Sequence, residues 1–565
     1  MEKYINRFWW IILLILLIPA VKALFVGGFY GASDELHVAW LYEIERSLLS
    51  GQFPPRFVPD LSFGFGYPLF NFVFPLPFYI AEIFRLFQFN LVDSIKIVFG
   101  VSLVLSAFSF VFLLKYLSPS KLIGLSGALL YVYTPYRATD TYVRGAIGEC
   151  LSFVFLPLVV LAVFKLTDGK TNQGLKWIGI GALSLAGLVL SHNITTYMFL
   201  PFAALLAILK LVLDKHKRYE MLVRLFAMGI FGLLISSYFW APALTESSFM
   251  KYDTVFNIKD HFPTLRQLIT PYFGYGASVP GPGDGLSFFV GGLNLFLLIS
   301  APVVLFKAWR KSDLNFKIIT SWILFSTVVA VFFMNHRSSF LWDKIPLLPY
   351  FQFPWRFLIL TTFLTPLLVV IFNFIKRGDL IIFLLVLISI SLSFQSFRPE
   401  HFLGRTDQYY LNKYIPAPFA KEEYLTHREE YLRLPKESLT RPEKNYPVVE
   451  VLSGTLSETV SINDLHIKAK VVMNHDSQLI FNKYFFPGWQ AKVDGKKTKV
   501  ETAKPFGQIK VAIPQGVHEV EFYFQETSFR MFFNILSLVS LILAVSFLFK
   551  KTNLLKILNF EKMVK

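Results

Sequence analysis

Two carboxylates and an imidazole lie close together near the start of the chain, in the segment Gly31-Ala-Ser-Asp-Glu-Leu-His37. If Ser33 caps a helix, Asp34 and Glu35 occupy its first turn, and Asp34 and His37 share one face because they are three residues apart. A group of this kind can serve as a general base or hold a metal ion. The alternative is structural, since acidic residues at a helix N-terminus also stabilise the helix dipole.

A second polar group follows in the segment from Tyr136 to Glu149. Arg137, Asp140 and Arg144 have the spacing i, i+3 and i+7, which on a helix places two guanidinium groups around one carboxylate. Arginine suits phosphate binding because its planar fork donates two hydrogen bonds to one anion. A ladder of ion pairs within the helix is the alternative. Glu149, at the end of the segment, is counted with this candidate site.

Four isolated polar residues complete the set of candidates. His192 lies at the end of an apolar run, where it makes either a structural hydrogen bond or a ligand contact. Arg56 and Asp60, in a stretch rich in glycine, proline and aromatic residues, either line a polar cleft or form a surface ion pair. Arg356 is a candidate for a second phosphate contact.

The elements that must position these residues are membrane-spanning helices. Of the 565 residues, 54% are hydrophobic and only 16% are charged, and the mean hydropathy is +0.51, which excludes an ordinary soluble domain. Apolar runs of about 20 residues, the length that crosses a bilayer, recur along the chain. We predict about twelve spans, at 8–27, 96–114, 122–135, 149–165, 177–191, 194–212, 225–243, 287–306, 318–334, 357–375, 380–396 and 531–549.

The basic residues set the predicted orientation in the plasma membrane. With a cytoplasmic N-terminus, the inner segments are rich in Lys and Arg, and their net charge accounts for nearly all of the total of +17, so nucleic acid is not needed to explain it. The C-terminus is then cytoplasmic too. The apolar segment 67–89 is predicted to be re-entrant or interfacial, because a crossing there would place the later basic loops outside. The predicted outer loops are 28–95, 136–148, 244–286 and 335–356.

The hydrophobic pattern divides the chain into a transmembrane domain (1–396), an extracytoplasmic region (397–530) and a last span with a basic cytoplasmic tail (531–565). Period-two alternation within the extracytoplasmic region predicts a β-sandwich over about residues 446–525. Its sequence contains neither a nucleophile paired with a base nor a metal-ligand spacing. We therefore expect binding or scaffolding there rather than catalysis. The single cysteine, Cys150, excludes an internal disulfide.

Several of these motifs resemble bacterial membrane proteins of the 6-pyruvoyl-tetrahydropterin synthase-related type. The motifs are Ser33-Asp-Glu-Leu-His37, the run from Pro54 to Asn71, Tyr142-Val-Arg-Gly145 with Glu149, and Ser191-His-Asn193. The C-terminal region is similar to the end of YfhO-like membrane proteins, through Phe486-Pro-Gly-Trp489, Val493-Asp-Gly495 and Pro514-Gln-Gly-Val-His518. The family label implies no pterin chemistry, since the sequence lacks the histidine cluster of such a zinc enzyme.

Both families are similar in layout to the GT-C superfamily of polytopic glycosyltransferases, so the resemblance implies a GT-C-like transmembrane fold. It also implies an inverting transfer in which Asp34 is the general base and Glu35 or His37 orients it. Arg137 and Arg144 would hold the phosphate of the donor.

The same resemblance implies the partners and the cofactor. The donor is a polyprenyl-phosphate-linked sugar drawn from the membrane lipid, and the acceptor is a glycan, a lipid or a protein. A divalent cation, Mg²⁺ or Mn²⁺, that bridges the phosphate to Asp34 and Asp140 is a variant of this mechanism.

Two functions of other classes remain open at this stage. A lipid or polysaccharide transporter or flippase typically has paired halves and broken helices near the middle of the bilayer, whereas the polar groups here gather at the outer helix ends. A non-catalytic scaffold that presents the β-domain would tolerate substitution of Asp34 and Arg144.

Overall fold

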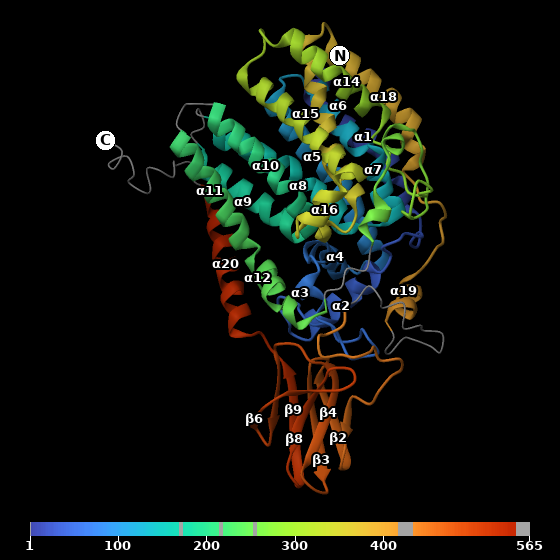
Figure 1. Cartoon of the computed structure of the whole chain (residues 1–565), viewed down its shortest axis with the longest axis vertical. Coiled ribbons are helices and arrows are strands. Elements are labelled where there is room, and N and C mark those ends of the chain that lie inside the picture. The colour runs from blue at the N-terminus through green and yellow to red at the C-terminus, as the bar shows by residue number, and fades with distance from the viewer. Residues whose placement is uncertain (1, 169–172, 214–217, 252–256, 416–432, 550–565) are drawn as a thin grey trace, which may run out of the picture.

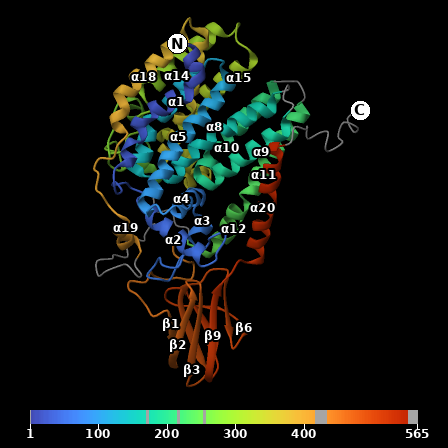
Figure 2. The same ribbon diagram turned by 180° about the vertical axis from the view of Figure 1, so that it is seen from behind.

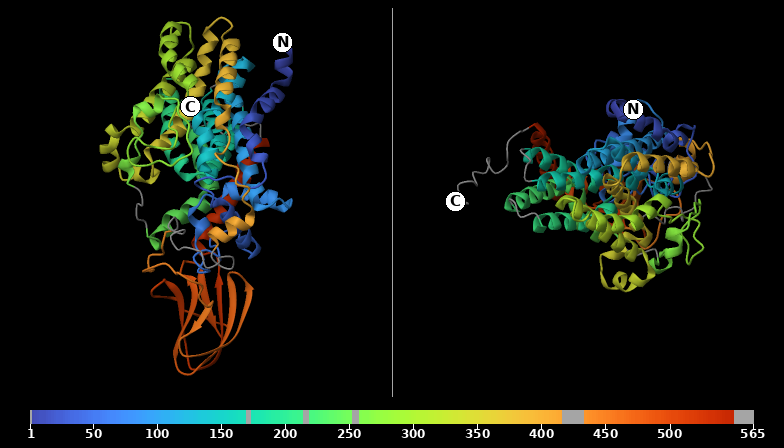
Figure 3. Two further views of the ribbon diagram at one scale, coloured as in Figure 1. Left: turned by 90° about the vertical axis from the view of Figure 1, so that its right-hand side faces the viewer. Right: turned by 90° about the horizontal axis from the view of Figure 1, so that it is seen from above.

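The computed structural model describes residues 2–168, 173–213, 218–251, 257–415 and 433–549. Its long helices form a bundle along the long axis of the molecule, and a β-domain projects from one end of that bundle (Figures 1 and 3). The N-terminus lies at the opposite end (Figure 1). Short helices lie between the bundle and the β-domain. The first predicted outer loop forms α2 (His37–Leu49), α3 (Leu69–Phe72) and α4 (Leu76–Leu86), and the start of the predicted extracytoplasmic region forms α19 (Asp407–Tyr414).

Nine helices in the described part of the chain are long and apolar enough to cross a membrane, and each coincides with a predicted span. They are α1 (Glu2–Val21), α5 (Leu91–Leu117), α8 (Ile147–Thr167), α9 (Gly174–Ser191), α10 (Asn193–Leu213), α15 (Leu314–Met334), α18 (Gly378–Ser393), α20 (Ser528–Phe549) and the continuous run of η7 (Pro354–Phe357), α17 (Leu358–Leu364) and η8 (Thr365–Phe374). The protein is therefore a polytopic α-helical membrane protein.

The other three predicted spans are also helical, but they are bent or short. The predicted span 225–243 contains a bend of 69°, between α11 (Arg218–Ile235) and α12 (Ser237–Thr245). Two consecutive serines mark this bend, and the Ser236 hydroxyl donates to the carbonyl of Gly232 at 3.0 Å. The remaining two helices, α6 (Lys121–Val132) and α14 (Gly292–Ala308), contain 12 and 17 residues.

The segment predicted to be re-entrant forms α3 and α4, which contain 4 and 11 residues. A helix of that length cannot cross a bilayer. Pro75 precedes α4 and Pro77 lies at its start, a position where the missing N–H is tolerated because the first turn has no intrahelical partner for it.

The β-domain consists of two antiparallel sheets, as the alternating pattern predicts. One sheet has the order β1-β4-β8-β7 and the other has the order β2-β3-β9-β5-β6. The strands are β1 (Val449–Val451), β2 (Gly454–Asn463), β3 (His466–Met473), β4 (Ser477–Tyr484), β5 (Trp489–Val493), β6 (Lys496–Thr498), β7 (Glu501–Ala503), β8 (Gln508–Ile513) and β9 (Gly516–Phe524).

The two sheets pack through aromatic side chains that point inward from each. Phe481 of β4 stacks on Phe522 of β9 with ring centroids 4.7 Å apart, and both side chains are fully buried. Trp489 of β5 meets Phe481 edge to face at 5.3 Å. Because successive strand residues face opposite sides, these inward rings alternate with polar residues on the outside, which makes the domain a sandwich.

The first outer loop docks directly on this sandwich. Phe57 is fully buried and contacts Trp489 and Phe524 at ring distances of 5.5 and 5.4 Å. The ammonium of Lys483 donates to the carbonyls of Pro59 and Gly64 at 2.9 and 2.7 Å. Thus Phe57, in the stretch of aromatics around Arg56 and Asp60, packs in the joint between loop and β-domain.

After the β-domain, α20 returns along the bundle beside α9 and α11 (Figure 2). Two contacts therefore hold the β-domain to the rest of the molecule, the layer of outer loops and the long apolar helix that follows the domain. The predicted basic tail lies in residues 550–565, outside the described residues.

Candidate functional site

A cavity of about 500 Å³ lies among the segments predicted to face outward. It collects six of the eleven candidate residues, which come from four separate parts of the chain: Asp34, His37, Arg144, Glu149, His192 and Arg356. A larger groove of about 690 Å³, between α5 and η1 (Lys22–Phe25), is mostly apolar and contains none of the candidates.

The two segments that carry Asp34 and Arg144 are joined through their backbones. The N–H of Asp34 donates to the carbonyl of Arg144 at 2.7 Å, and the N–H of Ser33 donates to the carbonyl of Val143 at 3.1 Å. Residues 33–36 form a turn, and α2 begins only at His37 without a side-chain cap. The expectation that Ser33 caps the helix is therefore wrong, because the second outer loop binds the amides of this turn.

Arg144 ends a π-helical turn, η2 (Thr139–Arg144), which follows α7 (Pro135–Ala138). Its Nη1 atom lies 2.7 Å from a carboxylate oxygen of Asp140 and 2.8 Å from one of Glu149. The Tyr136 hydroxyl donates to Glu149 and accepts from the same Nη1 atom at 3.1 Å. Two buried carboxylates and a phenol thus fix the orientation of this guanidinium at the edge of the cavity.

Arg356 differs from Arg144 in its lack of protein partners. Its side chain is 8% exposed, and its Nε and Nη1 atoms have no hydrogen-bond partner among the described residues. The preceding cavity residue, Gln352, has a φ of 67°, in the left-handed region that side chains rarely adopt. A buried guanidinium with unfilled donors is costly, and the position of Arg356 in the cavity wall leaves these donors available to a bound molecule.

Both histidines of the cavity are buried and neutral. Burial lowers the pKa of His37 to about 4 and that of His192 to about 3. His192 Nδ1 lies 2.7 Å from the hydroxyl of Thr195 and accepts the Thr195 backbone N–H at 3.2 Å. Neither ring nitrogen of His37 has a hydrogen-bond partner among the described residues. His37 therefore does not orient Asp34 through a hydrogen bond.

The Asp34 carboxylate is half-buried and accepts no hydrogen bond from any described residue. It lies near His37, Arg144 and Arg356, since its charge acts on all three side chains. A carboxylate without a permanent partner, in a cavity with two guanidinium groups, is free to accept a proton from a bound molecule.

Arg137 and Asp140 do not line the cavity, contrary to the expectation that they share a face with Arg144. The wide π turn rotates Arg144 away from Arg137, whose Nη2 donates to Ser106 at 2.9 Å and whose guanidinium stacks 4.1 Å above the ring of Phe153. Asp140 is fully buried, and burial raises its pKa. A metal ion that bridges Asp34 and Asp140 is therefore not supported.

Glu35 also points away from the cavity. It pairs with Arg405 at 2.6 Å and with the ammonium of Lys413, and it accepts a hydrogen bond from Tyr414. These contacts anchor the first outer loop to α19. The role of orienting Asp34, which the resemblance assigns to Glu35 or His37, is thus filled by neither side chain.

Arg56 and Asp60 lie in two different buried networks, and neither lines the cavity. Asp60 lies 3.8 Å from the Nε atom of Arg46, and it also faces Lys483 of the β-domain. Burial raises the pKa of Asp60 and lowers that of Lys483. The cleft predicted between Arg56 and Asp60 is therefore replaced by the docking surface of the sandwich.

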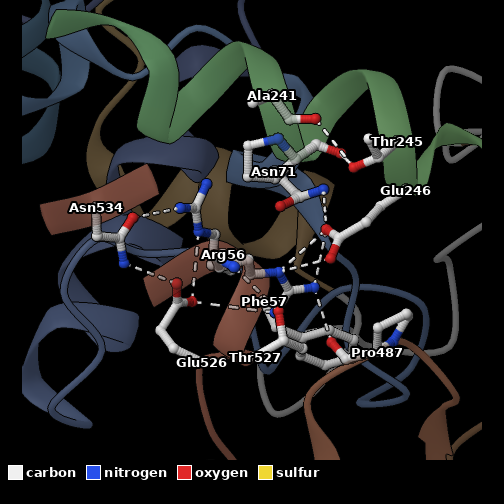
Figure 4. Close-up of polar contacts among 12 residues, drawn as sticks. Arg56, Phe57, Asn71, Ala241, Thr245, Glu246, Pro487, Glu526, Thr527 and Asn534 are labelled. Atoms are coloured by element: carbon white, nitrogen blue, oxygen red, sulfur yellow. Dashed lines mark hydrogen bonds and ion pairs between the residues drawn. The ribbon is translucent and has the colours of Figure 1, made fainter. Parts of the chain in front are cut away.

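The network around Arg56 joins the first outer loop to α20 (Figure 4). The Nη2 atom of Arg56 donates to Asn534 at 3.0 Å, and its Nε atom lies 3.4 Å from Glu526. Beside it, Arg530 binds both carboxylate oxygens of Glu246 at 2.9 and 3.0 Å. We call Arg530, Glu246 and their shared neighbour Asn71 the clasp.

The clasp lies directly behind the cavity wall. Asn71 donates to Glu246 at 2.9 Å, and its neighbours Leu69 and Phe72 in α3 line the cavity. Met250 also lines the cavity, immediately after the short helix η3 (Glu246–Phe249). Neither Glu246 nor Arg530 was predicted from the sequence, because the two residues that bind each other are 284 positions apart and no local pattern connects them.

Further residues of the cavity escaped the sequence-based prediction. Trp40 lies three residues after His37, so its helical spacing alone places it on the same face. Tyr350 and Gln352 lie in a loop whose aromatic residues are typical of a membrane interface. Arg433 has no signal in the sequence that connects it to the site.

Comparison with known sequences places the chain in a family. Residues 70–399, more than half of the chain, match the sequence model of the 6-pyruvoyl-tetrahydropterin synthase related domain, described as a membrane protein. The chain belongs to this family. Of the six candidate residues in the cavity, Arg144, Glu149, His192 and Arg356 lie within the family domain, whereas Asp34 and His37 precede it. Among the described residues, no three His, Cys, Asp or Glu side chains group as they would around a metal ion.

One curated relative and two solved structures are similar to this family member. An uncharacterized protein of Lactococcus lactis subsp. cremoris is 28% identical over 252 residues, which are 43% of this chain and 40% of that protein. Two cryo-EM structures of the arabinofuranosyltransferase AftD from Mycobacteria, one of them of a mutant, each match 70% of this chain with a TM-score of 0.43. Their identities are 13% and 11%, and the match covers 27% and 28% of the AftD chain. The chain thus spans less than half of each of these proteins.

Proposed function

We propose that the protein is a membrane glycosyltransferase that uses a polyprenyl-phosphate-linked sugar on the extracytoplasmic side of the membrane, with Asp34 as the general base. The observation that supports this most directly is one cavity lined both by Asp34, whose carboxylate accepts no hydrogen bond from a described residue, and by Arg356, whose Nε and Nη1 atoms have no partner among those residues. A transferase needs these two groups together, a proton acceptor for the acceptor hydroxyl and a cation for the departing phosphate.

The proposed reaction inverts the anomeric carbon. The acceptor oxygen attacks that carbon as Asp34 takes the hydroxyl proton, a new glycosidic bond forms, and the bond from the carbon to the phosphate oxygen breaks. The lipid phosphate leaves as an anion, which Arg356 and Arg144 stabilise. Arg144 is already paired with Glu149, so Arg356 supplies the larger share of uncompensated positive charge.

The proposed orientation follows from the charges of the loops. The cavity lies among loops that we assign to the outside, because the basic loops favour the cytoplasmic side. The N-terminus and the β-domain lie at opposite ends of the molecule (Figure 1). With the N-terminus in the cytoplasm, the β-domain and the cavity lie outside, where a flipped polyprenyl-phosphate sugar exposes its head group.

The decisive experiment measures the release of polyprenyl phosphate from a panel of polyprenyl-phosphate sugars in membrane vesicles that contain the protein and its native acceptors. We expect Asp34→Asn to lower the rate about 10²- to 10⁴-fold, the usual contribution of a general base. Asp343→Asn is the matched control, since Asp343 lies exposed in another outer loop and does not line the cavity.

A binding measurement separates the two roles. Arg356→Met should weaken the binding of a polyprenyl phosphate about 10- to 100-fold, the loss of charge-assisted hydrogen bonds to one anion, while Asp34→Asn should leave it unchanged. Arg337→Met, an exposed cation of the same loop, is the control. Release by Asp34→Asn at the wild-type rate, or no release above vesicles that lack the protein, would overturn the proposal.

A further inference from the structure

The cavity contains a second kind of unsatisfied polar group besides the guanidinium of Arg356. His37 is 6% exposed, it lines the cavity, and both of its ring nitrogens lack a hydrogen-bond partner among the described residues. A buried histidine is normally hydrogen-bonded through at least one nitrogen, as His192 is through Thr195. The absence of partners for the His37 ring therefore points to a ligand that forms hydrogen bonds with its nitrogens.

The chemistry of that ligand follows from the state of the ring. Burial keeps His37 neutral, so one nitrogen is a donor and the other is an acceptor. A phosphate would offer only acceptors and an ammonium group only donors. Hydroxyl groups offer both, so one hydroxyl of a ring can bind one nitrogen directly while the other nitrogen is satisfied by a more distant hydroxyl or through water.

The aromatic side chains around His37 suit the apolar face of a ligand ring that carries hydroxyl groups. The ring of Trp40 lies edge to face with that of His37 at 5.3 Å, and both contact Phe78. Trp40, Tyr67, Phe72 and Phe74 continue this wall of the cavity. Aromatic walls with a few placed polar groups recognise molecules that have both apolar C–H faces and hydroxyl edges, and a sugar ring has both.

We propose that His37 and Trp40 form the sugar subsite of the cavity, which takes a neutral ring with free hydroxyl groups, while Arg356 takes the adjoining phosphate. This inference rests on the proposed function for the phosphate half of the ligand. It adds that the donor sugar carries no charged group at the edge that faces His37, because a charge there would lie against a neutral imidazole in an apolar wall.

The test compares two lipids with purified protein in detergent, a polyprenyl phosphate and the same lipid carrying a neutral hexose, by native mass spectrometry. Wild-type protein should bind the sugar-bearing lipid more tightly. His37→Phe keeps an aromatic ring, and it should lose about 10-fold or more of that difference while its affinity for the bare polyprenyl phosphate stays within about twofold. His37→Asn keeps a donor and an acceptor and should recover part of the difference.

The controls separate this inference from the proposed function. His401→Phe replaces an exposed histidine that does not line the cavity, and it should behave as the wild type does. Loss of bare polyprenyl phosphate binding in Arg356→Met reports on the phosphate half alone. If His37→Phe binds both lipids as the wild type does, or if the sugar adds nothing in the wild type, the sugar subsite is refuted.

A further outcome is also decisive. If the wild type binds neither lipid, the proposed function fails, and the same variants are then compared with free neutral methyl glycosides. Tighter glycoside binding by the wild type than by His37→Phe would retain the sugar subsite, and equal binding would refute it.

Discussion

The backbone N–H of Asp34 donates to the backbone carbonyl of Arg144 at 2.7 Å, across 110 positions of the chain. The proposed base and the guanidinium opposite it are therefore set by one main-chain bond rather than by contacts between their side chains. A side-chain substitution at either residue leaves this bond in place. Functional tests at Asp34 thus probe chemistry with little disturbance of the fold, whereas loss of the Arg144 guanidinium would leave the buried carboxylates of Asp140 and Glu149 without their cation.

This tether depends on Gly145, which follows the π turn with a φ of 70°. A β-carbon there would lie 2.9 Å from that of Ala32, and a side chain would be strained in this conformation. We expect Gly145→Val to destabilise the protein by about 1 kcal/mol or more and to weaken polyprenyl phosphate binding. Thermal denaturation and binding measure the two effects. Gly283→Val, at an open position, should change neither.

Substitution of Arg530 in the clasp should destabilise the protein more than most single substitutions do. Arg530 is fully buried and Glu246 is 6% exposed, so Arg530→Met leaves a buried carboxylate without its cation. We expect a loss of about 3–5 kcal/mol in the free energy of unfolding, measured by chemical denaturation in detergent. The double variant with Glu246→Met should recover part of the loss.

The surface pair Lys468–Glu519 provides a comparison for the clasp. Both side chains are more than a third exposed, and their charged atoms are 3.4 Å apart. Removal of either charge should cost about 0–1 kcal/mol. A loss for Arg530→Met as small as this would mean that the clasp does not hold α20 against the bundle.

The stability of the protein should fall as the pH falls below neutrality. His37 titrates near 6.5 in the unfolded chain and near 4 in the folded protein, so protons bind preferentially to the unfolded state between these values. The apparent Tm should therefore decrease between pH 7 and pH 4. His37→Gln should show a shallower decrease than the wild type, and a slope identical to that of the wild type would contradict the burial of this ring.

Lys483 should hold the β-domain to the first outer loop. Its ammonium is buried, donates to two loop carbonyls and faces Asp60 and Glu43. Lys483→Met should leave these groups unpaired and destabilise the docking by a few kcal/mol. Limited proteolysis in the outer loop near Pro59 and Gly64 should then become faster. Lys497→Met, on an exposed strand of the same domain, is the control.

The helices and most of the sandwich follow from patterns that are local in the sequence. Each predicted span falls on a helix because an apolar run in lipid must satisfy its backbone internally. The strand β8 shows the alternation from which the β-sandwich is predicted, since Ile509, Val511 and Ile513 are buried and the residues between them are less so. The strand β2 was not predicted, since it is exposed almost throughout and therefore lacks the alternation of a half-buried strand.

The cavity could be predicted only in part. The polar clusters around Asp34 and Arg144 are visible in the sequence, and the structure brings these two residues together. The face that each side chain occupies is not visible, because a single π turn separates Arg137 from Arg144. Glu246 and Arg530 are 284 positions apart, and no local pattern connects residues at that distance.

The clasp also bears on the order in which the protein is made. Glu246 is synthesised long before Arg530. Until Arg530 follows, Asn71 is present as a partner for Glu246 but its counter-ion is missing. The ion pair forms only when α20 packs against α9, α11 and α12. The support behind the cavity wall is therefore completed late in synthesis. A nascent chain that stalls before α20 lacks the Arg530–Glu246 ion pair, although every residue that lines the cavity has already been synthesised.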